Sequence, residues 1–121
     1  MGHSLKVVVV DDKVMITDLF ESYFKIALPD LSVKVFNNAL EALDYFQTTE
    51  DIDVVITDYN MPGVNGIELL EATNPKTKRI MISGFVSDIA EDKLNDLNAV
   101  FFEKPVPMKK LGSIIEDMMR S

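Results

Sequence analysis

The sequence contains no cysteine, which excludes disulfides, thiolate metal sites and cysteine nucleophiles. Its single histidine, His3, lies at the very start of the chain, so a histidine-rich zinc site and a histidine base placed within the fold are excluded as well. No apolar run approaches the roughly 20 residues that a membrane span requires. No signal peptide precedes the first apolar run, and the cytoplasm is therefore the expected location.

Basic side chains are scarce: 12 Lys and Arg against 20 Asp and Glu give a net charge of −8. So acidic a chain gains little from a polyphosphate or an anionic membrane surface, and we expect neither as a direct partner. The remaining composition is ordinary for a globular protein, and 121 residues fit one domain better than two. We place this domain at residues 5–119. Residues 1–4 resemble a cloning remnant, and we expect no output domain in this chain.

Short apolar runs alternate with longer amphipathic segments along the sequence. The apolar runs predict strands at 5–10, 32–36, 53–57, 79–82 and 99–102. Apolar residues recurring every three or four positions predict five helices, at 14–28, from 39, at 66–73, at 88–97 and from 107. Asn38 is expected to cap the second helix, with the Glu41 side chain reaching back to it. Pro107 is expected to be the first residue of the last helix.

A strand followed by a helix, five times over, implies right-handed crossovers and a parallel sheet covered on both faces. A chain of this size fits the flavodoxin-like doubly wound α/β fold, with five strands in the order 2-1-3-4-5 and five helices. The alternating second strand is expected at an edge, with Lys34 toward solvent. In such sheets the functional crevice lies outside the carboxyl ends of the strands, beside the point where their order reverses.

Polar residues of complementary chemistry stand at the carboxyl ends of four predicted strands. Asp11 and Asp12 follow the first strand and Asp58 follows the third, whereas Ser83 and Lys104 follow the fourth and fifth. Three carboxylates at one edge repel one another unless a cation joins them, and oxygen ligands without His or Cys suit Mg²⁺. With a lysine and a hydroxyl nearby, the set predicts a phosphoryl-transfer site in which a carboxylate attacks.

Each of these residues also has a purely structural interpretation. Asp12 could cap the following helix, and Asp58 could be a turn residue before the Met-Pro-Gly loop. Taken alone, Ser83 reads better as a strand-end turn residue and Lys104 as a solvated side chain before Pro105. The agreement of all four strand ends favours the site.

Four motifs resemble those of the receiver domains of two-component response regulators, of the chemotaxis-regulator type: VVVVDD, ITDYNMPGVNG, MISG and FFEKP. The resemblance covers approximately residues 6–119. It implies that Asp58 is the phosphoacceptor, that Asp12 binds Mg²⁺ directly and that Asp11 acts mainly through its waters. The backbone carbonyl of Asn60 would be a further ligand.

The same resemblance assigns roles to the later motifs. Ser83 would hydrogen-bond the phosphoryl group and Lys104 would pair with it. Phe101 falls at the aromatic switch position, where the ring turns inward as the serine moves toward the phosphate. Gly84 would leave the phosphoryl group open to attack, and the bond before Pro105 would be cis. One departure is the short segment ATNPKTKR, which predicts a trimmed helix before the fourth strand.

The resemblance implies a signalling switch that catalyses only its own phosphoryl transfer and autodephosphorylation. A sensor histidine kinase or phosphotransfer protein would phosphorylate it, and residues 88–119 would form the face read by a downstream output domain or protein, or by a second copy in a homodimer. The chain would be a single-domain regulator or a receiver cut from a longer protein.

Two alternatives are a receiver-like module that binds partners without phosphorylation and a Mg²⁺-dependent phosphohydrolase. The intact acidic set and Lys104 argue against the first. Such hydrolases carry a D-x-D motif, whereas Asp58 is followed by Tyr59 and Asn60, which argues against the second.

Overall fold

The computed structural model describes residues 5–84 and 91–120. Its five strands are parallel and lie in the order β2-β1-β3-β4-β5, which confirms the predicted topology. The strands are β1 (Lys6–Val10), β2 (Ser32–Phe36), β3 (Val54–Asp58), β4 (Lys78–Ser83) and β5 (Ala99–Glu103). The helices are α1 (Val14–Ala27), α2 (Ala39–Thr48), α3 (Gly66–Glu71), α4 (Glu91–Leu97) and α5 (Met108–Met119). Residues 1–4, and residues 88–90 of the predicted fourth helix, lie outside the described residues.

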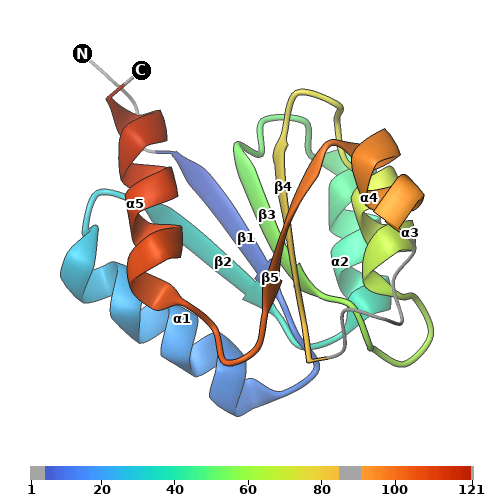
Figure 1. The fold of residues 1–121 in the computed structure, drawn as a ribbon, viewed down its shortest axis with the longest axis horizontal. Coiled ribbons are helices and arrows are strands. Elements are labelled where there is room, and N and C mark those ends of the chain that lie inside the picture. Colours follow the sequence, from blue (N-terminus) through green and yellow to red (C-terminus); the bar gives the residue numbers. More distant parts are fainter. Residues whose placement is uncertain (1–4, 85–90, 121) are drawn as a thin grey trace.

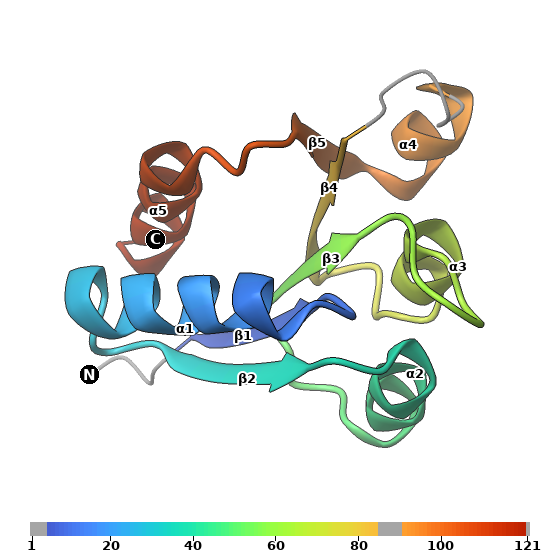
Figure 2. The ribbon, with the colours of Figure 1, turned by 90° about the horizontal axis from the view of Figure 1, so that it is seen from below.

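The sheet separates two layers of helices. Helices α1 and α5 cover one face, while α2, α3 and α4 cover the other (Figures 1 and 2). Strand β1 shows how the sequence serves both layers, because Val7 and Val9 belong to the core under α1 and α5, whereas Val8 and Val10 belong to the opposite core. The continuous valine run is therefore buried on both faces, as predicted. No helix in the described ranges has the length and apolar character needed to cross a membrane.

Strand β2 forms one edge of the sheet, as its alternating sequence predicts. Lys34 is exposed there, and its Nζ lies 5.4 Å from the ring centroids of both Phe36 and Tyr45. The two aromatic rings hold the Lys34 ammonium group at the open edge of the sheet, where its charge discourages pairing with a strand of another chain.

The helix starts differ in detail from the predictions. Asn38 caps α2 by accepting from the backbone N–H groups of Leu40 and Glu41. The reciprocal capping box expected of Asn38 and Glu41 is instead found at α3, between Asn65 and Glu68. Pro107 occupies the N-cap of α5 rather than its first helical position, a shift of one residue. Helix α3 has only six residues, which confirms that it is trimmed.

Arg79 is a buried charge within β4, a strand predicted to be buried. Its Nε donates to Thr73 Oγ1 at 2.9 Å and its Nη2 donates to Thr73 O at 3.0 Å, while Nη1 donates to Leu97 O at 2.9 Å. Burial lowers the pKa of Arg79. The guanidinium thus joins the chain just after α3 to the end of α4 and supplies donors for carbonyls that the helix ends leave unpaired.

Replacing this guanidinium should destabilise the fold. In Arg79→Met the carbonyls of Thr73 and Leu97 lose these donors, and we expect the free energy of unfolding to fall by about 2–4 kcal/mol, since each unpaired buried polar group costs about 1–3 kcal/mol. Urea unfolding would measure the change. The control is Lys76→Met, which removes a neighbouring but exposed charge and should stay within about 0.5 kcal/mol of the wild type. Equal stability of the two variants would contradict the role given to Arg79.

Candidate functional site

The predicted site residues gather at the carboxyl edge of the sheet, at the lower end of the strands in Figure 1. Asp11 directly follows β1, Asp58 and Ser83 are the last residues of β3 and β4, and Lys104 directly follows β5. Because these strands are neighbours in the order β1-β3-β4-β5, the topology alone brings the four ends together. The crevice is beside the reversal of strand order, between β1 and β3, as expected for this type of sheet.

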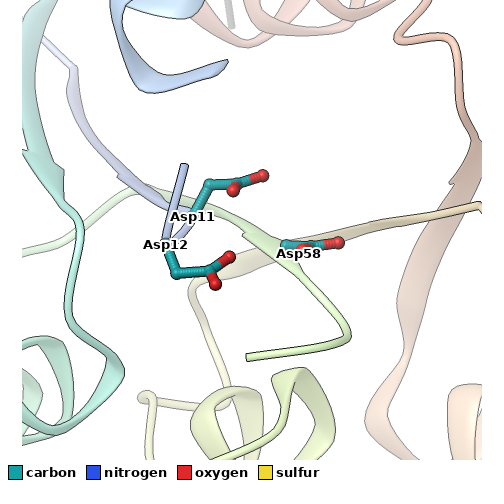
Figure 3. Close-up of side chains that lie close together, drawn as sticks. All are labelled: Asp11, Asp12 and Asp58. Atoms are coloured by element: carbon teal, nitrogen blue, oxygen red, sulfur yellow. The ribbon is translucent and has the colours of Figure 1, made fainter. Parts of the chain in front are cut away.

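Three carboxylates converge in this crevice. Figure 3 shows the side chains of Asp11 and Asp12 extending from the end of β1 toward Asp58 on β3. One oxygen from each of the three lies within 4.8 Å of the others. Asp11 and Asp58 are buried, with 3% and 5% of their surface exposed, whereas Asp12 is exposed. Two buried carboxylates and one exposed carboxylate therefore share a single site.

The turn that carries the first two carboxylates is held by backbone groups. Asp11 Oδ1 accepts the N–H of Lys13 at 2.9 Å, and Lys13 is the N-cap of α1 without a side-chain cap bond. Asp12 is therefore not the cap of this helix, and the structural interpretation of that residue is wrong. Its carboxylate faces the other two instead (Figure 3).

The backbone of Asp58 is fixed by a close contact with the start of α3. Tyr59 N donates to Asp58 Oδ1 at 3.0 Å, and Gly66 N donates to Tyr59 O at 2.9 Å, which closes the loop between β3 and α3. A Cβ atom at Gly66 would lie 2.5 Å from Asp58 O and 2.9 Å from Met81 Sδ. Only glycine permits this approach, so the last position of the GVNG loop is set by packing against the acidic residue.

Lys104 is the cation that faces the carboxylates. Its Nζ lies 3.3 Å from Asp58 Oδ1 and 3.9 Å from Asp11 Oδ2. Its backbone N–H donates to Ser83 O at 2.9 Å, and the peptide bond between Lys104 and Pro105 is cis, as the resemblance implies. One ammonium group beside three carboxylates leaves an excess of negative charge in a partly dehydrated site.

The pKa of Asp11 in this site is raised above its ordinary value of 3.8. Burial is the largest cause, and the negative charges of Asp58 and Asp12 add to it; the Lys13 N–H bond and the charge of Lys104 act in the opposite direction. A site that resists ionisation of its own carboxylate favours an added cation. Its donors are carboxylate oxygens at one edge, with no His or Cys among the cluster, and this set fits Mg²⁺.

The remaining predicted residues surround this cluster. Ser83 is fully buried, one position beyond Ile82, the residue of β4 paired with Asp58. Phe101 is partly buried and packs against the core under α2, α3 and α4. Asn60 is exposed in the loop after β3. A Cβ at Gly84 would meet no atom of the described residues within 4 Å.

One contact at the site has no counterpart in the sequence analysis. Asn37 Nδ2 donates to the backbone carbonyl of Asp11 at 2.9 Å. The sequence analysis singled out its neighbour Asn38 as a helix cap and passed over Asn37. The predicted topology could have identified Asn37, because a residue just after β2 must lie beside the end of β1 when the two strands pair in parallel.

Comparison with known proteins identifies the family of this chain. Residues 7–116 match the response regulator receiver domain family. The chain belongs to this family. Receiver domains are signalling domains of two-component systems. The chain is 32% identical over 102 residues to the transcriptional regulatory protein FlgR of Helicobacter pylori, across 84% of this chain and 26% of FlgR. It therefore spans about a quarter of the length of that relative.

Solved structures agree with this assignment. A response regulator receiver domain protein from Clostridium thermocellum is similar with a TM-score of 0.83 and 25% identity, over 96% of this chain and 94% of that one. The receiver domain of Ssk1 from Saccharomyces cerevisiae, solved together with the histidine phosphotransfer protein Ypd1, has a TM-score of 0.79 at 16% identity, over 99% and 92% of the two chains. At 16% identity, the similarity to the Ssk1 receiver domain shows a shared fold alone.

The raised pKa of Asp11 gives a prediction for this receiver domain without metal. The folded state binds the proton more tightly than the unfolded chain, so the stability contribution of Asp11 falls as the pH rises from the ordinary pKa of 3.8 through the raised pKa, and the cost is complete once the pH is above the raised pKa. Asp11→Asn keeps an Oδ1 acceptor for Lys13 N–H and removes the charge. We therefore expect Asp11→Asn to be more stable than the wild type at pH 7, with a difference that shrinks toward pH 4.

Urea unfolding in a chelating buffer at several pH values would measure this difference. Asp18→Asn, at an exposed position of α1, controls for the loss of one negative charge elsewhere. If both variants behave alike, or if the advantage of Asp11→Asn grows at low pH, the electrostatic description of the site is wrong.

Proposed function

We propose that this receiver domain accepts a phosphoryl group on Asp58 from a phosphohistidine, with Mg²⁺ bound at the acidic cluster. The observation that supports the proposal best is the position of Asp58: a buried carboxylate that ends the central strand, between Lys104 and the Asp11–Asp12 turn. Membership of the receiver family supports the same assignment.

The contacts described for the Asp58 side chain, from Tyr59 N–H and Lys104 Nζ, fall on Oδ1. We therefore infer that Oδ2 is the attacking oxygen. The new P–O bond forms at Oδ2 as the P–N bond to the imidazole breaks, and the electron pair of that bond stays on the imidazole nitrogen, which is protonated from solvent. When bound, Mg²⁺ neutralises part of the charge on the phosphoryl oxygens.

Asp12 and the backbone carbonyl of Asn60 would hold the metal directly, together with Asp58, while Asp11 would act mainly through metal-bound water. Lys104 would follow the transferred charge from Asp58 to the phosphoryl oxygens, a short move for an ammonium group 3.3 Å from Oδ1. The hydroxyl of Ser83, at the end of the neighbouring strand, would donate to another of these oxygens.

The consequence of phosphorylation would be a shift between two conformations. Ser83 moving toward the phosphoryl group would free space that the ring of Phe101 enters from its partly buried position. Phe101 has no hydroxyl and would act by packing alone. The face formed by α4, β5 and α5 would then bind a downstream output domain or protein partner, or a second copy of the domain.

Phosphorylation can be tested on the intact protein. We expect incubation with phosphoramidate and Mg²⁺ to add one phosphoryl group to the wild type, measured by intact-protein mass. The addition should vanish without Mg²⁺ and in Asp58→Asn, while Asp44→Asn, at an exposed position of α2, should be labelled like the wild type. Amide NMR shifts on adding beryllium fluoride would detect a product that hydrolyses too quickly to accumulate. If neither reagent has an effect, the phosphorylation proposal is wrong, and the alternative of a module that binds partners without phosphorylation is favoured.

We expect the donor protein to approach over the carboxyl edge of the sheet, because Asp58 is the last residue of β3 and lies at that edge. Exposed apolar side chains flank that edge on the first turns of α1, directly after the acidic turn: Val14, Met15 and Leu19, exposed to 56%, 85% and 48%. The solved pair of Ssk1 and a histidine phosphotransfer protein is a receiver bound to such a donor. We infer that this end of α1 contacts the phosphohistidine protein.

A matched pair of variants tests the contact. Ile26 lies near the far end of α1 and is 84% exposed, nearly the same as Met15. With any phosphohistidine protein that labels the wild type, Met15→Ala should slow the transfer about fivefold or more, as expected for loss of an interface anchor worth about 1 kcal/mol. Ile26→Ala should not, and phosphoramidate should label both variants at the wild-type rate. Equal transfer to the two variants would contradict this docking site.

A further inference from the structure

We propose that Asn37 is a positioning residue for the metal site: its side-chain amide holds the turn that presents Asp11 and Asp12, and its loss weakens Mg²⁺ binding. The inference rests on the proposed function in so far as Mg²⁺ binds there. It concerns a residue outside the acidic cluster, on the connection between β2 and α2.

Asn37 uses both hydrogens of one amide nitrogen. Nδ2 donates to the backbone carbonyl of Asp11 at 2.9 Å and to Thr17 Oγ1 at 2.9 Å. The acceptors lie 26 and 20 residues away in the sequence. One side chain therefore connects three segments: the end of β2, the acidic turn and the second turn of α1.

The carbonyl of Asp11 belongs to the peptide plane that joins Asp11 to Asp12. Because that plane is rigid, holding its oxygen fixes the direction in which the chain enters Asp12. The N–H of Asp11 is held from the same side, since it donates to Phe36 O at 3.1 Å. Both ends of Asp11 are thus tied to consecutive residues of one connection. Asp12 is exposed, so the backbone is its main restraint.

The second acceptor sets the turn against the helix. Thr17 is 1% exposed, and its hydroxyl donates to Val14 O at 3.1 Å while it accepts from Asn37. The hydroxyl hydrogen and one lone pair are both engaged, so the geometry leaves Asn37 little freedom to shift. Partners of this kind around a metal site keep its ligands in place before the metal arrives.

The neighbouring asparagine provides a control. Asn38 also makes two hydrogen bonds with its side chain, but both are to the first turn of α2, at Leu40 N and Glu41 N. Truncation of either residue removes two bonds from the same connection. Only truncation of Asn37 releases the acidic turn, so the two variants separate an effect on the metal site from a general loss of stability.

The experiment is calorimetric titration of Mg²⁺ into the wild type, Asn37→Ala, Asn38→Ala and Thr17→Val, with urea unfolding of each. We expect Asn37→Ala to raise the Kd for Mg²⁺ about tenfold, the lower end of what loss of an outer partner costs a metal site. Thr17→Val, which removes one of the two acceptors, should raise it by a smaller factor. Asn38→Ala should lower the urea midpoint through loss of the α2 cap and leave the Kd unchanged.

The outcomes separate the inference from the function on which it rests. Wild-type affinity in Asn37→Ala and Thr17→Val overturns the positioning role and leaves the metal site standing. Equal weakening in Asn37→Ala and Asn38→Ala also overturns it, because the effect would then follow stability. A wild type that does not bind Mg²⁺ overturns the proposed metal site itself. If Asn37→Ala does not fold, Thr17→Val decides by the same criterion.

Discussion

The crowding of three carboxylates within 4.8 Å is the constraint on which the rest of this structure depends. Parallel strands end at one edge, so the topology delivers the acidic residues to one place whether or not a cation is there. Lys104 offsets part of their charge and cannot offset all of it. The fold therefore carries an unfavourable electrostatic term, and the same term gives the site its preference for a divalent cation.

Backbone N–H groups, together with the side-chain amide of Asn37, keep the carboxylates in place against this repulsion. Asp11 and Asp58 each accept an amide N–H, from Lys13 and Tyr59, and these bonds need no metal. The start of α3 closes on Asp58 through Gly66, where a methyl group would not fit. The acidic crevice is thus built into the turns that follow β1 and β3. A cation would find the oxygens already gathered.

The features that could be predicted from the sequence are those set by hydrophobic periodicity and by the positions of the strand ends. The burial of Val7 to Val10 on both faces of the sheet and the position of Asp58 follow from short-range patterns combined with one topological rule. The sequence did not predict the partners of Asn37 and Arg79, because acceptors 6 to 26 residues away and outside the same helix or strand leave no periodic signal in the sequence. The capping box was assigned to Asn38 instead of Asn65 for a related reason: both have a glutamate three residues on, and spacing alone does not choose between them.

The path from the site to the proposed partner face is short for a structural reason. Lys104 N–H donates to Ser83 O, so the two residues proposed to follow the phosphoryl charge are joined through their backbones. They belong to neighbouring strands, and β5 is the edge of the sheet. Phe101, paired with Met81 of β4, stands on that edge strand. A charge added at Asp58 would therefore reach, through Lys104, an edge strand that has a neighbouring strand on one side only.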